Sequence, residues 1–106
     1  MIEHTVAAEA WWNRFDVLVT PTTAGPPTML GDYTKGYESG RGSAFTRPFN
    51  ITGQPAISVP IGWPNDGLPR GAQVVAPIGR DDLLITIAAA LEAVEPWSHR
   101  RATVSA

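Results

Sequence analysis

The sequence contains no cysteine among its 106 residues. That absence excludes disulfide bridges, thiolate nucleophiles and cysteine-based zinc sites, and it leaves the redox compartment open. Lysine occurs once, at Lys35, and the two histidines, His4 and His99, stand near opposite ends of the chain. Neither histidine has a carboxylate pair at the spacing of metal ligands. We therefore expect no metal site and no cofactor.

Long apolar runs and clusters of basic charge are also missing. No apolar stretch approaches about 20 residues, the length of a membrane span. The segment Met1–Glu9 lacks the basic and apolar regions of a signal peptide. Lysine and arginine total 8 against 10 acidic residues, and the basic residues are scattered. We expect a cytoplasmic protein that binds neither nucleic acid nor a membrane.

Length and composition place the chain at the lower edge of domain size. Compact domains usually hold about 100 to 150 residues. The sequence is 43% apolar and 17% charged, which is more apolar surface than a small freestanding domain can readily hide. Part of that surface is expected to meet a partner.

Apolar patterning predicts an α/β chain with a mixed sheet of about three strands and helices beside it. The expected elements are a helix at 3–15, strands at 16–20, 56–61 and 71–76, helical turns at 45–53, and a helix ending at Val94. The first strand is apolar throughout, which suits burial on both faces. A glycine-rich stretch, Thr22–Gly42, is expected to be a long loop. The prolines and Asp-Gly pair of residues 62–70 indicate a turn, which favours antiparallel pairing of the flanking strands.

The last helix has the clearest pattern. Its apolar residues fall at helical spacing and are expected to pack on the sheet: Leu84, Ile87, Ala88, Leu91 and Val94. Asp81 and Asp82 precede this stripe. A carboxylate pair can do acid–base work, but acidic residues ahead of an apolar helix favour capping of the helix N-terminus.

Four motifs occur in a characteristic order. They are Asp16–Thr22 (DVLVTPT), Phe45–Pro60 (FTRPFNITGQPAISVP), Gly67–Val75 (GLPRGAQVV) and the Asp82-Leu83-Leu84 start of the last helix. From about Asp16 to Trp97 the chain resembles the C-terminal part of amidase-signature enzymes. The resemblance implies a C-terminal segment of the amidase-signature fold, with residues 1–106 forming a single partial domain.

The resemblance also implies what the chain lacks. The family cleaves carboxamide bonds with a serine nucleophile, a second serine held in a cis peptide, and a lysine base, all from a Gly/Ser-rich core upstream of the matched region. None of the serines here lies in a Gly-Ser-Ser-like stretch: Ser39, Ser43, Ser58, Ser98 and Ser105. A pairing of Ser39 or Ser43 with Lys35 is conceivable, but a lysine on a Gly-rich loop is more often a solvated charge. We expect no catalytic residue in this chain and no activity from it alone.

The segment before the second motif is where the resemblance implies contacts with an amide substrate. Ser43, Ala44 and Phe45 would line the side of the pocket, although they can equally begin a helical turn. Three further residues are expected to be structural and to shape the turn into the next strand: Asn50, Gly53 and Pro55. The tryptophans are open to two interpretations, packing or an interface: Trp11, Trp12, Trp63 and Trp97.

Two functions follow as hypotheses. In the first, the chain is a segment of an amidase that needs a polypeptide bearing the catalytic triad. In the second, it is a freestanding binding or assembly module that keeps the fold without the chemistry. In either case an open strand edge and an apolar face favour a homo-oligomer.

Overall fold

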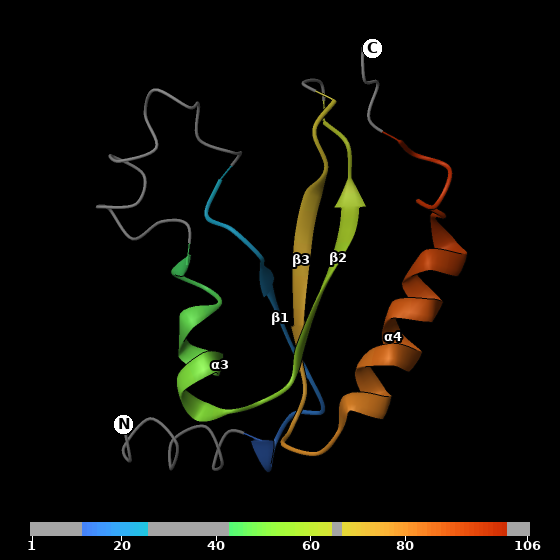
Figure 1. Ribbon diagram of the computed structural model, residues 1–106. Helices are drawn as coiled ribbons and strands as arrows, with labels where there is room; N and C mark the ends of the chain where they lie inside the picture. Colours follow the sequence, from blue (N-terminus) through green and yellow to red (C-terminus); the bar gives the residue numbers. More distant parts are fainter. Residues whose placement is uncertain (1–11, 26–42, 65–66, 102–106) are drawn as a thin grey trace.

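The computed structural model describes residues 12–25, 43–64 and 67–101 (Figure 1). Within these ranges the chain forms β1 (Leu18–Pro21), α3 (Arg47–Thr52), β2 (Ala56–Gly62), β3 (Arg70–Val75) and α4 (Asp81–Val94). Most of the helix expected at 3–15 and of the loop expected at Thr22–Gly42 lies outside the described residues.

The sheet has three strands in the order β1-β3-β2. The α/β class and the expected pairing of β2 with β3 are confirmed, and Ile57 lies opposite Val74. Both strand pairs are antiparallel, so this sheet is not mixed. The short connection between β2 and β3 accounts for their own pairing, because a hairpin can be that short whereas a parallel crossover needs a dozen residues or more.

Strand β1 differs from its prediction. It lies at one edge of the described sheet, and Val19 is 61% exposed, so the strand is not buried on both faces. The strand was expected at 16–20 but runs over Leu18–Pro21, with Pro21 as its last member opposite Ala72. An edge strand tolerates proline because the N–H groups on its outer side need no partner within the sheet.

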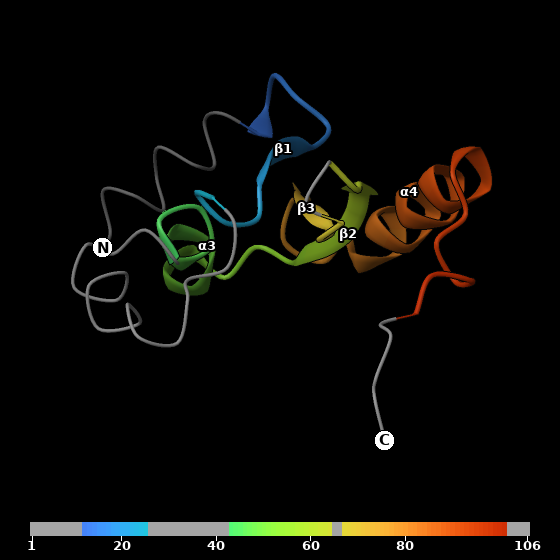
Figure 2. The ribbon, with the colours of Figure 1, turned by 90° about the horizontal axis from the view of Figure 1, so that it is seen from above.

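The two helices lie on opposite sides of the sheet, as Figures 1 and 2 show from perpendicular directions. Side chains alternate between the faces of a strand, so Ile57 and Val74 share one face. On that face Val74, Ala76 and Leu84 form a buried cluster. The partly buried apolar residues packed against this cluster are Val17, Ile57, Leu83 and Ile87. The core therefore lies between the sheet and α4.

The first half of helix α4 packs against the sheet, and its second half does not. Leu84 is buried at 4% exposure, while Leu91 is 37% and Val94 84% exposed. Figures 1 and 2 both show the helix leaning away from the sheet toward its C-terminal end. The predicted apolar stripe is therefore covered at its beginning and open at its end. Within the described ranges no helix is long and apolar enough to cross a membrane.

Helix α3 follows its local signals. Pro48 lies in the first turn, where a missing N–H leaves no helical bond unmade. Gly53 adopts a φ of 83° and its N–H donates to the carbonyl of Phe49 at 2.9 Å. That left-handed conformation is open to glycine and ends the helix.

The C-terminal tail returns to the connection between β2 and β3. His99, Arg100 and Arg101 are exposed. The guanidinium of Arg100 nevertheless lies over the half-buried ring of Trp63, 4.1 Å from its centroid. This cation–π contact places Trp63 in intramolecular packing.

Candidate functional site: a polar sheet face

The sheet face opposite α4 carries polar side chains from all three strands. They are Thr20, Ser58 and Gln73, joined by Thr22 directly after β1. In the strand register Gln73 lies opposite both Thr20 and Ser58, so these side chains point to the same side. Thr22 continues the pairing through its N–H, which donates to the carbonyl of Gly71 at 3.1 Å. We call this set the polar face.

Gln73 lies at the centre of the polar face and is 4% exposed. Its Nε2 donates to the hydroxyl of Thr20 at 3.0 Å and to the backbone carbonyl of Phe45 at 2.8 Å. A side-chain amide nitrogen carries two hydrogens, so both are used. The buried amide nitrogen is thereby satisfied, and Phe45 is connected to the central strand.

A second pair of contacts bridges the polar face above Gly71. The hydroxyls of Thr22 and Ser58 lie 2.7 Å apart, and each can serve as the donor. A Cβ added at Gly71 would lie 2.9 Å from the Thr22 hydroxyl oxygen and 3.0 Å from that of Ser58. The two outer strands can therefore join hydroxyls across β3 because the central position has no side chain.

The three predicted pocket residues lie directly before α3. The N–H of Thr46 donates to the carbonyl of Ser43 at 3.2 Å, so this segment forms a turn, which leaves the pocket role untested. The hydroxyl of Ser43 accepts a hydrogen bond from Nη2 of Arg47 at 3.1 Å. Arginine remains protonated in proteins, so this partner cannot act as a base. Lys35 lies outside the described residues, and the pocket role of Ser43, Ala44 and Phe45 stays a prediction.

Two of the three predicted structural residues occupy the passage from α3 to β2. Gly53 ends the helix, and the carbonyl of Pro55 accepts a hydrogen bond from the N–H of Ala76 at 3.1 Å. Between them Gln54 is 6% exposed, and its side-chain oxygen contacts the hydroxyl of Thr52. Asn50 is an exposed residue of α3. The structural roles assigned to these residues remain predictions.

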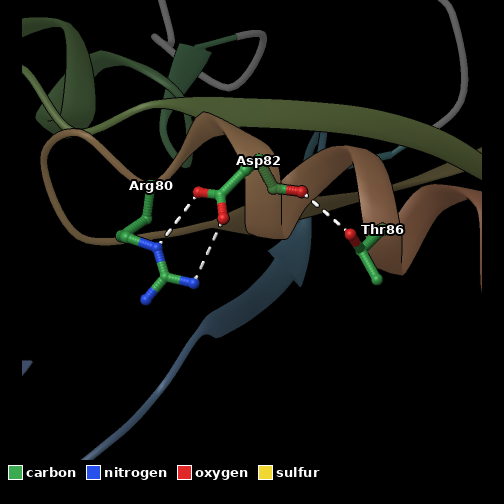
Figure 3. Close-up of polar contacts among 3 residues, drawn as sticks. All are labelled: Arg80, Asp82 and Thr86. Atoms are coloured by element: carbon green, nitrogen blue, oxygen red, sulfur yellow. Dashed lines mark hydrogen bonds and ion pairs between the residues drawn. The ribbon is translucent and has the colours of Figure 1, made fainter.

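Asp81 and Asp82 lie in the first turn of α4, as the pattern predicted, and both are exposed. The capping interpretation is wrong in detail, because the N-cap residue is Arg80 and it makes no side-chain capping bond. Arg80 donates two hydrogen bonds to the carboxylate of Asp82, at 3.0 and 3.3 Å, and the hydroxyl of Thr86 donates to the backbone carbonyl of Asp82 at 3.0 Å. Figure 3 shows these contacts. The hydrogen bond from Arg80 holds the pKa of Asp82 below its ordinary value, and the same bond raises the pKa of Arg80. Asp82 is thus a paired carboxylate rather than a proton donor.

The chemistry of the polar face is that of binding and orientation. Hydroxyls and a side-chain amide can donate and accept hydrogen bonds, but at neutral pH they do not remove a proton from a nucleophile. In the part of the chain that the structure describes, no three His, Cys, Asp or Glu side chains gather as a metal would need. The groups of the polar face can therefore bind and orient a partner group by hydrogen bonding.

Sequence reasoning missed Gln73 and Gly71. Each had a signal, because Gln73 is the polar residue in the apolar run Ala72–Ala76 and Gly71 lies within a predicted strand. A buried polar residue in such a run needs a partner, and a strand glycine often marks a close approach. The partners themselves lie far away in sequence, so the signals could not name them.

Comparison with known proteins finds relatives that are named as amidases or hydrolases. A family model described as Amidase matches residues 3–85. The 6-aminohexanoate-cyclic-dimer hydrolase of Paenarthrobacter ureafaciens is 45% identical over 107 residues, covering 88% of this chain and 22% of that protein. The acylamidase of Rhodococcus erythropolis is 38% identical, covering 84% of this chain and 20% of that protein. The chain spans about a fifth of the length of these relatives.

Solved structures give the same result. The 6-aminohexanoate cyclic dimer hydrolase complexed with substrate aligns with a TM-score of 0.83 and 40% identity, covering 92% of this chain and 23% of that one. A glutamyl-tRNA(Gln) amidotransferase component from Thermotoga maritima aligns with a TM-score of 0.78 and 31% identity, covering 88% of this chain and 20% of that one. The described strands and helices thus match one segment of these larger proteins.

Proposed function

The chain belongs to the amidase family, and on this premise we propose that it forms a substrate-side segment of an enzyme that hydrolyses carboxamide C–N bonds. The observation that carries the proposal is the close structural likeness to a hydrolase solved with its amide substrate bound. The relatives' names point to the substrate class, since a cyclic dimer of 6-aminohexanoate and the substrates of an acylamidase are both amides.

In this proposal the chain forms part of the substrate pocket, and the remainder of the enzyme supplies the catalytic groups. Amide hydrolysis needs an activated nucleophile, a base that takes its proton, and donors for the oxyanion. These groups come from a polypeptide that bears the triad. The segment Ser43–Phe45 forms part of the pocket wall, and the polar face supports that wall from beneath through the bond from Gln73 to Phe45.

A graft tests the proposal. The segment of the Paenarthrobacter hydrolase that aligns with this chain is replaced by this chain's residues, and hydrolysis of the 6-aminohexanoate cyclic dimer is measured. We expect kcat/KM within about a hundredfold of the parent, because the wall is similar in form while its position can shift by fractions of an ångström. The 106-residue chain alone should release no amine from the cyclic dimer, from aliphatic amides or from aromatic amides.

Two outcomes would contradict the proposal. One is a graft that folds with the parent's circular dichroism and unfolding temperature yet hydrolyses nothing, and this result would favour a binding or assembly module. The other is turnover by the isolated chain that Ser43→Ala abolishes, since a nucleophile would then lie within this chain.

A further inference from the structure

We infer that Gln73 is a positioning residue, which fixes the wall segment Ser43–Phe45 against the sheet through the Phe45 carbonyl. The inference rests on the proposed function, because it assigns Gln73 a part in shaping the pocket of that enzyme. Its evidence lies in the contacts of the polar face.

The environment of Gln73 makes its hydrogen bonds compulsory. The side chain is 4% exposed, and Val75, which lies two positions along the central strand on the same face, is fully buried. An amide in such a place is strongly unfavourable unless its hydrogens are bonded. The bonds to Thr20 and Phe45, at 3.0 and 2.8 Å, meet that requirement.

Thr20 sets the orientation of the amide. Its hydroxyl oxygen accepts one hydrogen of Gln73 and its own hydrogen is donated to the carbonyl of Pro21 at 2.9 Å. Because the hydrogen bond to Thr20 fixes the planar amide group, the direction of its second N–H bond is fixed as well. This N–H meets the carbonyl of Phe45, 28 residues away in sequence. The sheet thus sets the position of a backbone atom in the wall.

Apart from the bond from Gln73, the hydrogen bonds of the wall segment in the described structure are local, and its side chains are at most half-buried. Helix α3, which follows it, has six residues and none of them is buried. Its N-cap, Thr46, makes no side-chain capping bond. The bonds from Thr46 and Arg47 to Ser43 lie within the segment and the start of α3, so they do not connect the segment to the sheet. The bond from Gln73 instead connects the segment to a strand of the core.

The test uses the graft with two matched substitutions, Gln73→Met and Gln54→Met. Both glutamines are buried, at 4% and 6% exposure, and methionine keeps their length while removing the amide. Gln54 contacts Thr52 at the end of α3, so it serves as the control for loss of a buried amide. We expect Gln73→Met to raise KM about tenfold with little change in kcat, because a displaced wall weakens binding of substrate and transition state alike.

Hydrogen exchange gives a second readout that needs no turnover. The amide of Thr46 is bonded to Ser43, so release of the wall should speed its exchange about tenfold in Gln73→Met and leave it unchanged in Gln54→Met. If both variants change KM and exchange equally, or if Gln73→Met changes neither, Gln73 does not position the wall. An inactive unsubstituted graft would instead count against the proposed function, while the exchange comparison would still decide this inference.

Discussion

Gly71 is the position at which one added carbon should do most harm to the polar face. In Gly71→Ala the new Cβ would approach the hydroxyl oxygens of Thr22 and Ser58 to 2.9 and 3.0 Å. The two outer strands would have to separate or lose their hydroxyl contact. We expect a loss of about 1–3 kcal/mol in the free energy of unfolding, the usual range for overpacking.

The measurement is urea unfolding of the chain at submicromolar concentration, followed by tryptophan fluorescence. Gly62→Ala is the control, because nothing lies within 4 Å of the Cβ it would add. Its effect should stay within about 0.5 kcal/mol, as for substitutions away from packed features. Equal effects from the two alanines would show that the hydroxyl bridge does not depend on Gly71.

The carboxylate of Asp82 should titrate below the ordinary aspartate value, since Arg80 donates to its charged form. A carboxyl whose pKa is lower in the folded state stabilises the fold above its unfolded pKa, about 3.9 for aspartate, and that contribution is lost as the pH falls through the folded value. Both side chains are exposed, so the effect on stability should be small. Carbon-detected NMR titration should show the Asp82 midpoint rising in Arg80→Gln. An unchanged midpoint would mean that the ion pair does not form in solution.

Single residues were predictable where their signals act locally. Pro48 and Gly53 bound a short helix through φ preferences that each residue carries itself. The roles of Gln73 and Gly71 depend on contacts with Phe45, Thr22 and Ser58, which lie in other parts of the chain. No spacing rule connects residues that meet only after the strands pair.

At the scale of elements, α4 is predicted to derive its stability from its first two turns. Leu84 is 4% exposed within the core cluster, so Leu84→Ala should lower the free energy of unfolding by about 2–5 kcal/mol. Val94 belongs to the same apolar stripe but is 84% exposed, and Val94→Ala should change stability by less than about 0.5 kcal/mol. Urea unfolding of both variants checks this expectation. Comparable losses would show that the whole stripe is packed.

The apolar pattern of an element indicates which of its residues can be buried. It does not indicate which other elements cover them. The periodicity of α4 and the short connection before β3 each predicted the element observed. The apolar run of β1 predicted cover on both faces, whereas Val19 is 61% exposed at the sheet edge. Hydrophobic periodicity cannot distinguish a central strand from an edge strand, because edge position is set by the pairing of the other strands.

At the scale of the molecule, the described core is small for the apolar surface it leaves open. The buried apolar residues are Val59, Ala72, Val74, Val75, Ala76 and Leu84. The large apolar residues that are exposed are Phe15, Val19, Ile51, Ile61, Leu68, Ile78, Ile85, Leu91 and Val94. Among the described residues, these nine exposed large apolar residues outnumber the six buried apolar ones. A chain that matches about a fifth of its relatives' length fits this imbalance, since the larger fold can cover what these residues cannot.

We therefore expect the isolated chain to self-associate at micromolar concentration. Two surfaces can drive association, the outer edge at β1 and the open end of α4. Val19→Lys places a charge on the edge strand, which blocks edge-to-edge pairing, and Val94→Lys places one on the helix end. Sedimentation velocity should show a shift toward monomer in Val19→Lys if the chains associate through the edge at β1. The shift should occur in Val94→Lys if they associate through the open end of α4. Ile87→Lys is the contrasting control, because Ile87 packs against the core cluster and a charge there should unfold the chain. A chain that sediments as a monomer without any substitution would contradict the expectation, and would show that residues 1–106 cover their own apolar surface.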